Sequence, residues 1–200
     1  MIDKILSEAD DIDWGNTDSV CNFYESQYLF FNNYKNLKDI EDIIEIVHIK
    51  ARYIESLIDR KHYTKALEIV VHIDFLLEQI KGKTDEYPKL EMENLFHNGL
   101  LNSRLKNHKT ALYMFQRLVI IDKDNDLYQN WLSHTKLDVR AKYLNIVSYT
   151  GLAIVFGSII CRLAFNFEFN RTLQLSGYIL MLIGWLTPLI IKYFEGKNKE

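Results

Sequence analysis

Three acid–histidine pairs stand at spacings that place both side chains on one face of a helix. Glu45 and His48 form a Glu-x-x-His pair, the ligand pattern of di-iron helical bundles, but that chemistry requires a second such pair and the sequence has none. The other two pairs are four residues apart, the spacing of an ordinary contact between helix turns. They are Glu68–His72 and Glu93–His97.

Other catalytic and metal-binding motifs are also missing. The sequence has no His-Glu-x-x-His zinc pattern, phosphate-binding glycine loop, Gly-x-Ser-x-Gly elbow or dinucleotide fingerprint. Cys21 and Cys161 are the only cysteines, which excludes a disulfide framework and a thiolate zinc site. We therefore expect no catalytic residues, no metal and no cofactor, with each histidine on a helix surface or in a groove, and we predict that the chain is not an enzyme.

Charge and hydrophobicity divide the chain into two parts. The 200 residues carry a formal net charge of −3 and are 48% hydrophobic, which excludes a disordered chain and gives no electrostatic signal for nucleic-acid binding. Residues 1–142 hold 19 basic and 24 acidic residues, whereas residues 143–200 hold 5 and 3. We predict an acidic N-terminal arm (1–17), a helical domain (18–142) and a membrane domain (143–200).

Two long uncharged runs indicate membrane-spanning helices. Tyr143–Cys161 has 19 residues and Thr172–Ile191 has 20, and neither contains a charged side chain. A bilayer core about 30 Å thick needs about 20 apolar residues in a helix, so each run is long enough to cross it. The alternative is a pair of helices buried in a soluble core. We predict a transmembrane hairpin with helices at about 143–164 and 172–192.

Basic residues near the ends of the two runs predict their orientation. Six flank the outer ends of the hairpin and only two lie in the link, so both termini are expected in the cytoplasm. The outer six are Lys136, Arg140, Lys142, Lys192, Lys197 and Lys199. The abundance of Ile, Asn, Lys and Tyr suggests a bacterial protein, hence an inner-membrane location.

Small residues within the two runs are candidates for helix packing. Helices in lipid associate through close backbone approach, which small side chains permit. The candidates, which also offer a route to a homo-oligomer, are Ala153, Gly157, Gly177 and Gly184. Neither run contains an ionisable side chain of the kind that proton- or ion-coupled transporters use, so transport is disfavoured.

The polar part of the chain shows helical periodicity throughout, which predicts an all-α fold. Apolar residues recur at spacings of three and four over 40–60 and 64–81, and further helices are expected over 18–34, 87–106 and 109–121. A last helix starts after Asp124-Asn125-Asp126. Because no stop signal follows it, we expect it to continue into the first apolar run.

The segment from Leu95 to Asn125 resembles a tetratricopeptide repeat. Gly99, Ala111 and Phe115 stand at the small, small and large apolar positions of that family. An earlier segment, Lys50–Ile73, matches more weakly through Ala66, which lies 45 residues before Ala111. The resemblance covers about half of the chain and implies an array of helical hairpins that binds proteins in a concave groove.

Carried onto this sequence, the groove would be lined by seven residues and would be acidic with apolar patches. They are His48, Glu55, Asp59, Glu93, Phe96, Leu100 and Arg104. A basic or mixed amphipathic protein segment suits this charge better than an acidic C-terminal peptide. We predict a membrane-anchored adaptor or scaffold. The alternative is a membrane effector whose helical domain senses a signal and whose oligomerised hairpins perturb the bilayer.

Overall fold

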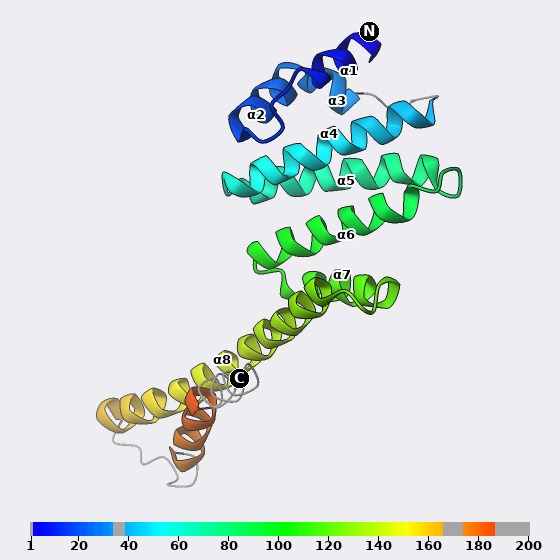
Figure 1. Cartoon of the computed structure of the whole chain (residues 1–200). Coiled ribbons are helices and arrows are strands. Elements are labelled where there is room, and N and C mark those ends of the chain that lie inside the picture. The colour runs from blue at the N-terminus through cyan, green and yellow to red at the C-terminus, as the bar shows by residue number, and fades with distance from the viewer. Residues whose placement is uncertain (1, 34–38, 166–173, 187–200) are drawn as a thin grey trace. The chain divides into compact units, whose positions relative to one another are not determined.

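The computed structural model describes residues 2–33, 39–165 and 174–186, and these residues form helices without any strand (Figure 1). The all-α prediction is thus confirmed for the described part of the chain. The helices are α1 (Ile2–Asp10), α2 (Thr17–Ser26), α3 (Tyr28–Asn33), α4 (Ile40–Asp59), α5 (Tyr63–Ile80), α6 (Tyr87–Arg104), α7 (His108–Ile121) and α8 (Asp126–Phe165), followed by an apolar helix, Gln174–Leu186.

The chain divides into two compact units, residues 1–135 and 136–200. In the first unit, α4 packs on α5, α5 on α6 and α6 on α7, which gives a stack of antiparallel helices (Figure 1). Helix α2 packs on α4 at one end of this stack. The stack is therefore an array of helical hairpins, in which α4–α5 and α6–α7 are successive pairs.

The two hairpins are closed by the same turn. Lys61 after α4 and Lys106 after α6 both have a φ of 62°, in the left-handed region. In each turn the following amide, of His62 or Asn107, donates to a carbonyl five residues back at 2.8 Å, the hydrogen bond that defines a Schellman cap. The two turns lie 45 residues apart, the same offset as Ala66 and Ala111. The chain therefore contains an internal structural repeat.

Small residues at the crossing of each hairpin let its helices approach closely. Ala66 and Ala111 are fully buried. In the second hairpin, a Cβ placed on Gly99 would lie 2.9 Å from the ring of Phe115, so glycine makes room for this ring. The positions 45 residues earlier hold Ile54 and Val70, both buried. The first hairpin thus has two medium-sized buried side chains where the second has a glycine and a large ring, so it has no equally large ring for which a glycine must make room.

The N-terminal segment expected as an acidic arm is a helix with one buried face. Ile5, Leu6 and Ala9 of α1 belong to the main hydrophobic core, and the acidic side chain of Asp10 is exposed. The predicted helix over 18–34 is divided into α2 and α3. Most of its aromatic residues lie in the same core, where the ring of Tyr24 stacks on that of Tyr53 of α4 with centroids 3.9 Å apart.

A lysine is buried at the centre of this core. Lys50 is 1% exposed, and its Nζ donates to the Tyr24 hydroxyl at 2.8 Å and to the Phe31 carbonyl at 2.9 Å. Burial lowers the pKa of this amine to about 7. Lys50 follows Ile43 and Val47 along the apolar stripe of α4, so the stripe itself carries the amine that joins α4 to α2 and α3.

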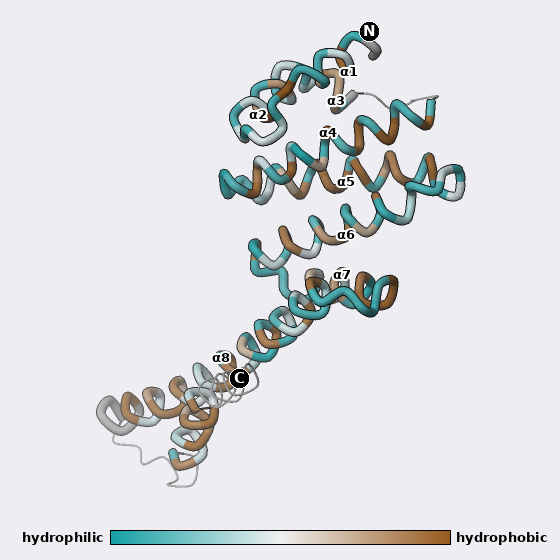
Figure 2. The backbone as a smooth tube through the Cα atoms, viewed as in Figure 1, coloured by the Kyte–Doolittle hydropathy of each residue, from teal (hydrophilic) through white to brown (hydrophobic). Residues whose placement is uncertain are grey.

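One helix of the described residues is long and apolar enough to cross a membrane, namely Asp126–Ile160 within α8 (Figure 2). It runs on from the polar segment into the first apolar run without a break, as expected. The second run is described only over Gln174–Leu186, an apolar helix shorter than a membrane span. The hairpin prediction requires two membrane-spanning helices, and the described residues contain one candidate. The remaining residues of the second run and the link before it lie outside the described residues.

Within the second unit, glycines bring the two apolar helices together. A Cβ on Gly184 would overlap the Cβ of Ser148, and one on Gly151 would lie 2.7 Å from the carbonyl oxygen of Gly177. Gly157 has no such neighbour within 4 Å, and Ala153 is exposed. Of the four packing candidates, Gly177 and Gly184 lie at the crossing, where Gly151 takes the place expected for Gly157.

The buried crossing at Ala111 leads to a prediction of stability. Replacing Ala111 with leucine should lower the free energy of unfolding by about 1–3 kcal/mol, because the added carbons have no space between α6 and α7. Urea unfolding of the full chain in detergent measures this loss. Thr110→Leu, at the exposed neighbouring position, is the control. Equal stability of the Ala111 variant and the wild type would show that the crossing is not tightly packed.

Lys50 leads to a prediction of pH dependence. Its pKa is about 7 in the folded chain and near 10.5 when unfolded, so the unfolded state holds the extra proton between these values. The contribution of Lys50 to the free energy of unfolding therefore rises with pH over that window, by up to about 1.4 kcal/mol per pH unit.

The free energy of unfolding of the full chain, compared between pH 7 and pH 9.5 for the wild type and Lys50→Met, measures this slope. The wild type should gain more stability than the variant. Burial raises the pKa of the Cys21 thiol and gives a slope of opposite sign, but both proteins share it. Parallel pH curves would contradict the prediction.

Candidate functional site

Two helices supply the residues of the predicted groove. His48, Glu55 and Asp59 follow one another along a single face of α4, at spacings of seven and four residues. Glu93, Leu100 and Arg104 are arranged in the same way along α6. Since α4 and α6 are the first helices of successive hairpins, equivalent faces of the repeat carry both sets.

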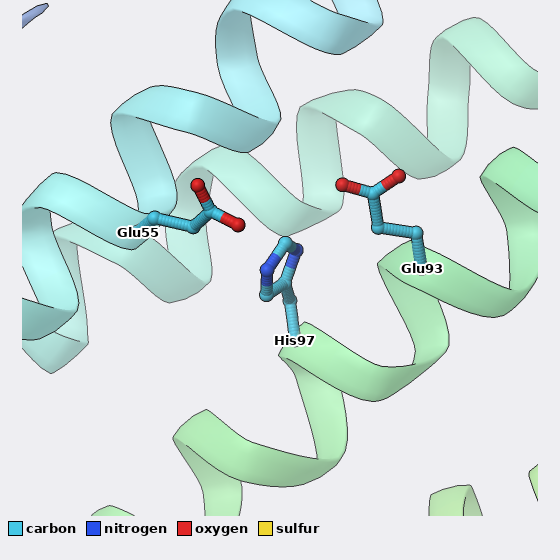
Figure 3. A group of neighbouring side chains, drawn as sticks. All are labelled: Glu55, Glu93 and His97. Atoms are coloured by element: carbon cyan, nitrogen blue, oxygen red, sulfur yellow. The ribbon is translucent and has the colours of Figure 1, made fainter. Parts of the chain in front are cut away.

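Glu55 and Glu93 converge on His97, a residue that was not predicted to line the groove. One ligand atom each of Glu55, Glu93 and His97 lies within 4.8 Å of the others (Figure 3). Figure 3 shows the imidazole of His97 between the two carboxyl groups, with Glu55 reaching it from α4 and Glu93 from the preceding turn of α6. We call these three residues the α4–α6 cluster.

His97 is the buried member of the α4–α6 cluster. It is 5% exposed, and its Nδ1 atom has no hydrogen-bond partner among the described residues. Burial lowers its pKa, and the nearby carboxylates of Glu93 and Glu55 oppose this shift only in part. The imidazole is therefore neutral at neutral pH, when one of its nitrogens carries a lone pair.

Arg52 is the basic side chain beside the α4–α6 cluster. Its Nη1 donates to Oε2 of Glu55 at 2.9 Å, and both side chains are substantially exposed. An exposed ion pair of this kind contributes little to stability. Because Arg52 occupies only Oε2 of the Glu55 carboxylate, the other oxygen, Oε1, can bind a ligand.

The remaining groove candidates are dispersed. Phe96 packs in an aromatic cluster with Phe115, Tyr128 and Trp131, so it belongs to the second, smaller core. Leu100 is half-buried on α6. Asp59 and Arg104 are exposed in the last turns of α4 and α6. The carboxylate of Asp59 extends the acidic surface of α4 beyond the cluster.

His48 lies at a separate pocket of about 330 Å³ where α1 meets α4. The pocket is lined by Ala9, Asp10, Trp14, Glu45, His48, Ile49 and Arg52. Burial raises the pKa of Glu45, and the negative charges of Asp10 and Asp42 raise it further. Negative charges therefore surround Glu45 at this pocket, which Arg52 also lines.

Sequence reasoning missed the convergence on His97 because its partners come from two helices. The Glu93–His97 pair was visible as a four-residue spacing, but Glu55 lies 38 positions before Glu93. The resemblance placed both glutamates on one groove, and that was the available signal. Extending the groove face of α6 by one position to His97 would have identified the cluster.

Comparison with protein-family models, curated proteins and solved structures found no match to this chain. The tetratricopeptide resemblance thus has no support from a family match. A helical-hairpin array does not by itself define a function, which depends on the residues that its surface carries.

Proposed function

We propose that this chain is a membrane-anchored, tetratricopeptide-like adaptor whose acidic α4 and α6 faces recruit a basic or mixed amphipathic protein segment. The observation that carries the proposal is the convergence of Glu55 and Glu93, from successive hairpins, on one surface. Asp59 continues the negative charge along α4, and the neighbouring Arg52 is already paired with Glu55. A lysine or arginine of the partner would complement this surface.

The long apolar helix supports the membrane part of the proposal. Only 17% of its most apolar window is buried, and Tyr149, Phe156 and Ile160 are among its exposed large side chains. A core helix of a soluble protein buries such residues, whereas a lipid-facing helix leaves them free to contact acyl chains. A bilayer is therefore the partner that best fits this unit.

The close glycine crossing supports a hairpin as the form of the anchor. Gly151, Gly177 and Gly184 bring the backbones of the two apolar helices together, as small residues do between membrane helices. With basic residues outside the ends of the hairpin, we place both termini in the cytoplasm, at a bacterial inner membrane. A homo-oligomer through the hairpin is compatible with this arrangement.

The orientation leads to a prediction of topology. Reporters fused at Met1 and after Glu200 should both be active in the cytoplasm, and one inserted near Asn166 should be active on the other side, because basic flanks stay on the cytoplasmic side. Fluorescent and secreted-enzyme reporters in a bacterial host measure this. Opposite locations for the two ends would mean that a single helix spans the membrane.

The acidic surface leads to a prediction of partner binding. Glu55→Lys, Asp59→Lys and Glu93→Lys, introduced together, should lower capture of the wild type's partner at least tenfold (about 1.4 kcal/mol), because the partner's basic residues would meet like charges. Quantitative affinity capture with the full chain from detergent extracts, in chelator-containing buffer, measures this. Higher salt should weaken the wild-type interaction, since exposed charges are screened over about 8–10 Å.

A second triple variant controls for net charge. Glu68→Lys, Glu78→Lys and Asp85→Lys change the charge equally at exposed positions outside α4 and α6. These substitutions should leave capture intact, and both variants should remain in the membrane fraction. Unchanged capture by the first variant, or equal losses for the two, would refute recognition at this surface.

A further inference from the structure

The α4–α6 cluster has the composition of a metal site as well as of an acidic surface. It offers one imidazole and two carboxylates, with one ligand atom of each residue within 4.8 Å of the others. Carboxylate oxygen and imidazole nitrogen are both common ligands of Zn²⁺. Two carboxylates with a neutral imidazole also balance the charge of a divalent ion.

The state of His97 is an independent observation that points to a ligand. The side chain is 95% buried, being 5% exposed, and Nδ1 lacks a hydrogen-bond partner in the described part of the chain. A buried polar atom without a hydrogen-bond partner destabilises the folded state. Figure 3 shows both ring nitrogens on the edge of the imidazole that faces the carboxyl groups of Glu55 and Glu93. The unpartnered imidazole is thus directed into the cluster.

We propose that Glu55, Glu93 and His97 bind one divalent transition-metal ion, with Zn²⁺ as the best fit. Three protein ligands leave a fourth position for water. Ligand atoms on a tetrahedral ion with bonds of about 2.1 Å lie about 3.4 Å apart. The two glutamate side chains lie nearer the surface than His97, and their rotation would bring the ligand atoms from the observed spacing to this distance.

Neighbouring charges are compatible with this site. Arg52 is held by Oε2 of Glu55, which leaves Oε1 to coordinate the ion. Glu93 and His97 stand four residues apart on α6, the spacing at which two side chains on one helix face share an ion.

Binding would join the two hairpins directly. Glu55 belongs to α4 and the other two ligands to α6, so the ion links the first helices of successive repeats. An ion that binds the folded state alone stabilises it by mass action. Zinc binding can be measured on the chain alone, without a partner, even though the two proposals share Glu55 and Glu93.

Calorimetric titration tests the site. Untagged full chain in detergent, stripped with a chelator and dialysed, is titrated with zinc chloride at pH 7. We expect saturable binding of one ion per chain and a higher midpoint of thermal unfolding in zinc than in chelator. Absence of saturable binding by the wild type would overturn the proposal.

Substitutions assign the binding to the cluster. Glu55→Gln and His97→Gln should each weaken zinc affinity at least tenfold, whereas Glu68→Gln combined with His72→Gln, a four-residue pair on α5, should leave it unchanged. Glu55→Gln keeps the proposal falsifiable if His97→Gln fails to fold, because Glu55 is at the surface. Unchanged affinity of Glu55→Gln would overturn the three-ligand site. Loss of zinc binding without loss of partner capture would separate this proposal from the adaptor function.

Discussion

The close approach of paired helices is the constraint on which the first unit depends. Ala66 and Ala111 lie fully buried at the two crossings, and each hairpin closes through a lysine in the left-handed region. A side chain in that conformation costs about 1–2 kcal/mol, so the packing on either side of the turn has to compensate for it. When both hairpins satisfy these conditions, α5 packs on α6, and α4 and α6 present equivalent faces.

The site is a product of this stacking. Glu55 and His97 come together only because the hairpins are stacked, since neither helix alone carries all three members of the cluster. Helical periodicity predicted α4 to α7 to within a few residues, and the repeat resemblance supplied the hypothesis that Glu55 and Glu93 face one groove. Neither pattern could predict the unpartnered Nδ1 of His97, because the burial of this side chain depends on how closely one turn of α6 packs against α4.

The apolar helices show a similar limit of sequence reasoning. Composition was sufficient to predict that α8 continues from a polar segment into an uncharged run. Which small residues make contact depends on the rotation of each helix about its axis, and composition says nothing of this. Gly151 therefore lies at the crossing and Gly157 does not, although both are glycines on one helix. Lys50 was missed for a related reason: its position within the apolar stripe of α4 was visible, but its acceptors, Tyr24 and Phe31, come from distant segments.

The proposed adaptor surface and the proposed metal site share Glu55 and Glu93, and this has a thermodynamic consequence. An ion held by these two carboxylates neutralises the charges that would attract a basic segment. The ion and the segment then oppose each other's binding by the same factor, since coupling between ligands is reciprocal. Asp59 lies outside the cluster and stays negative in either state, so a partner contact there is not lost with the others. Metal availability would in this way modulate recruitment through the charge of one surface, without a change in the helical scaffold.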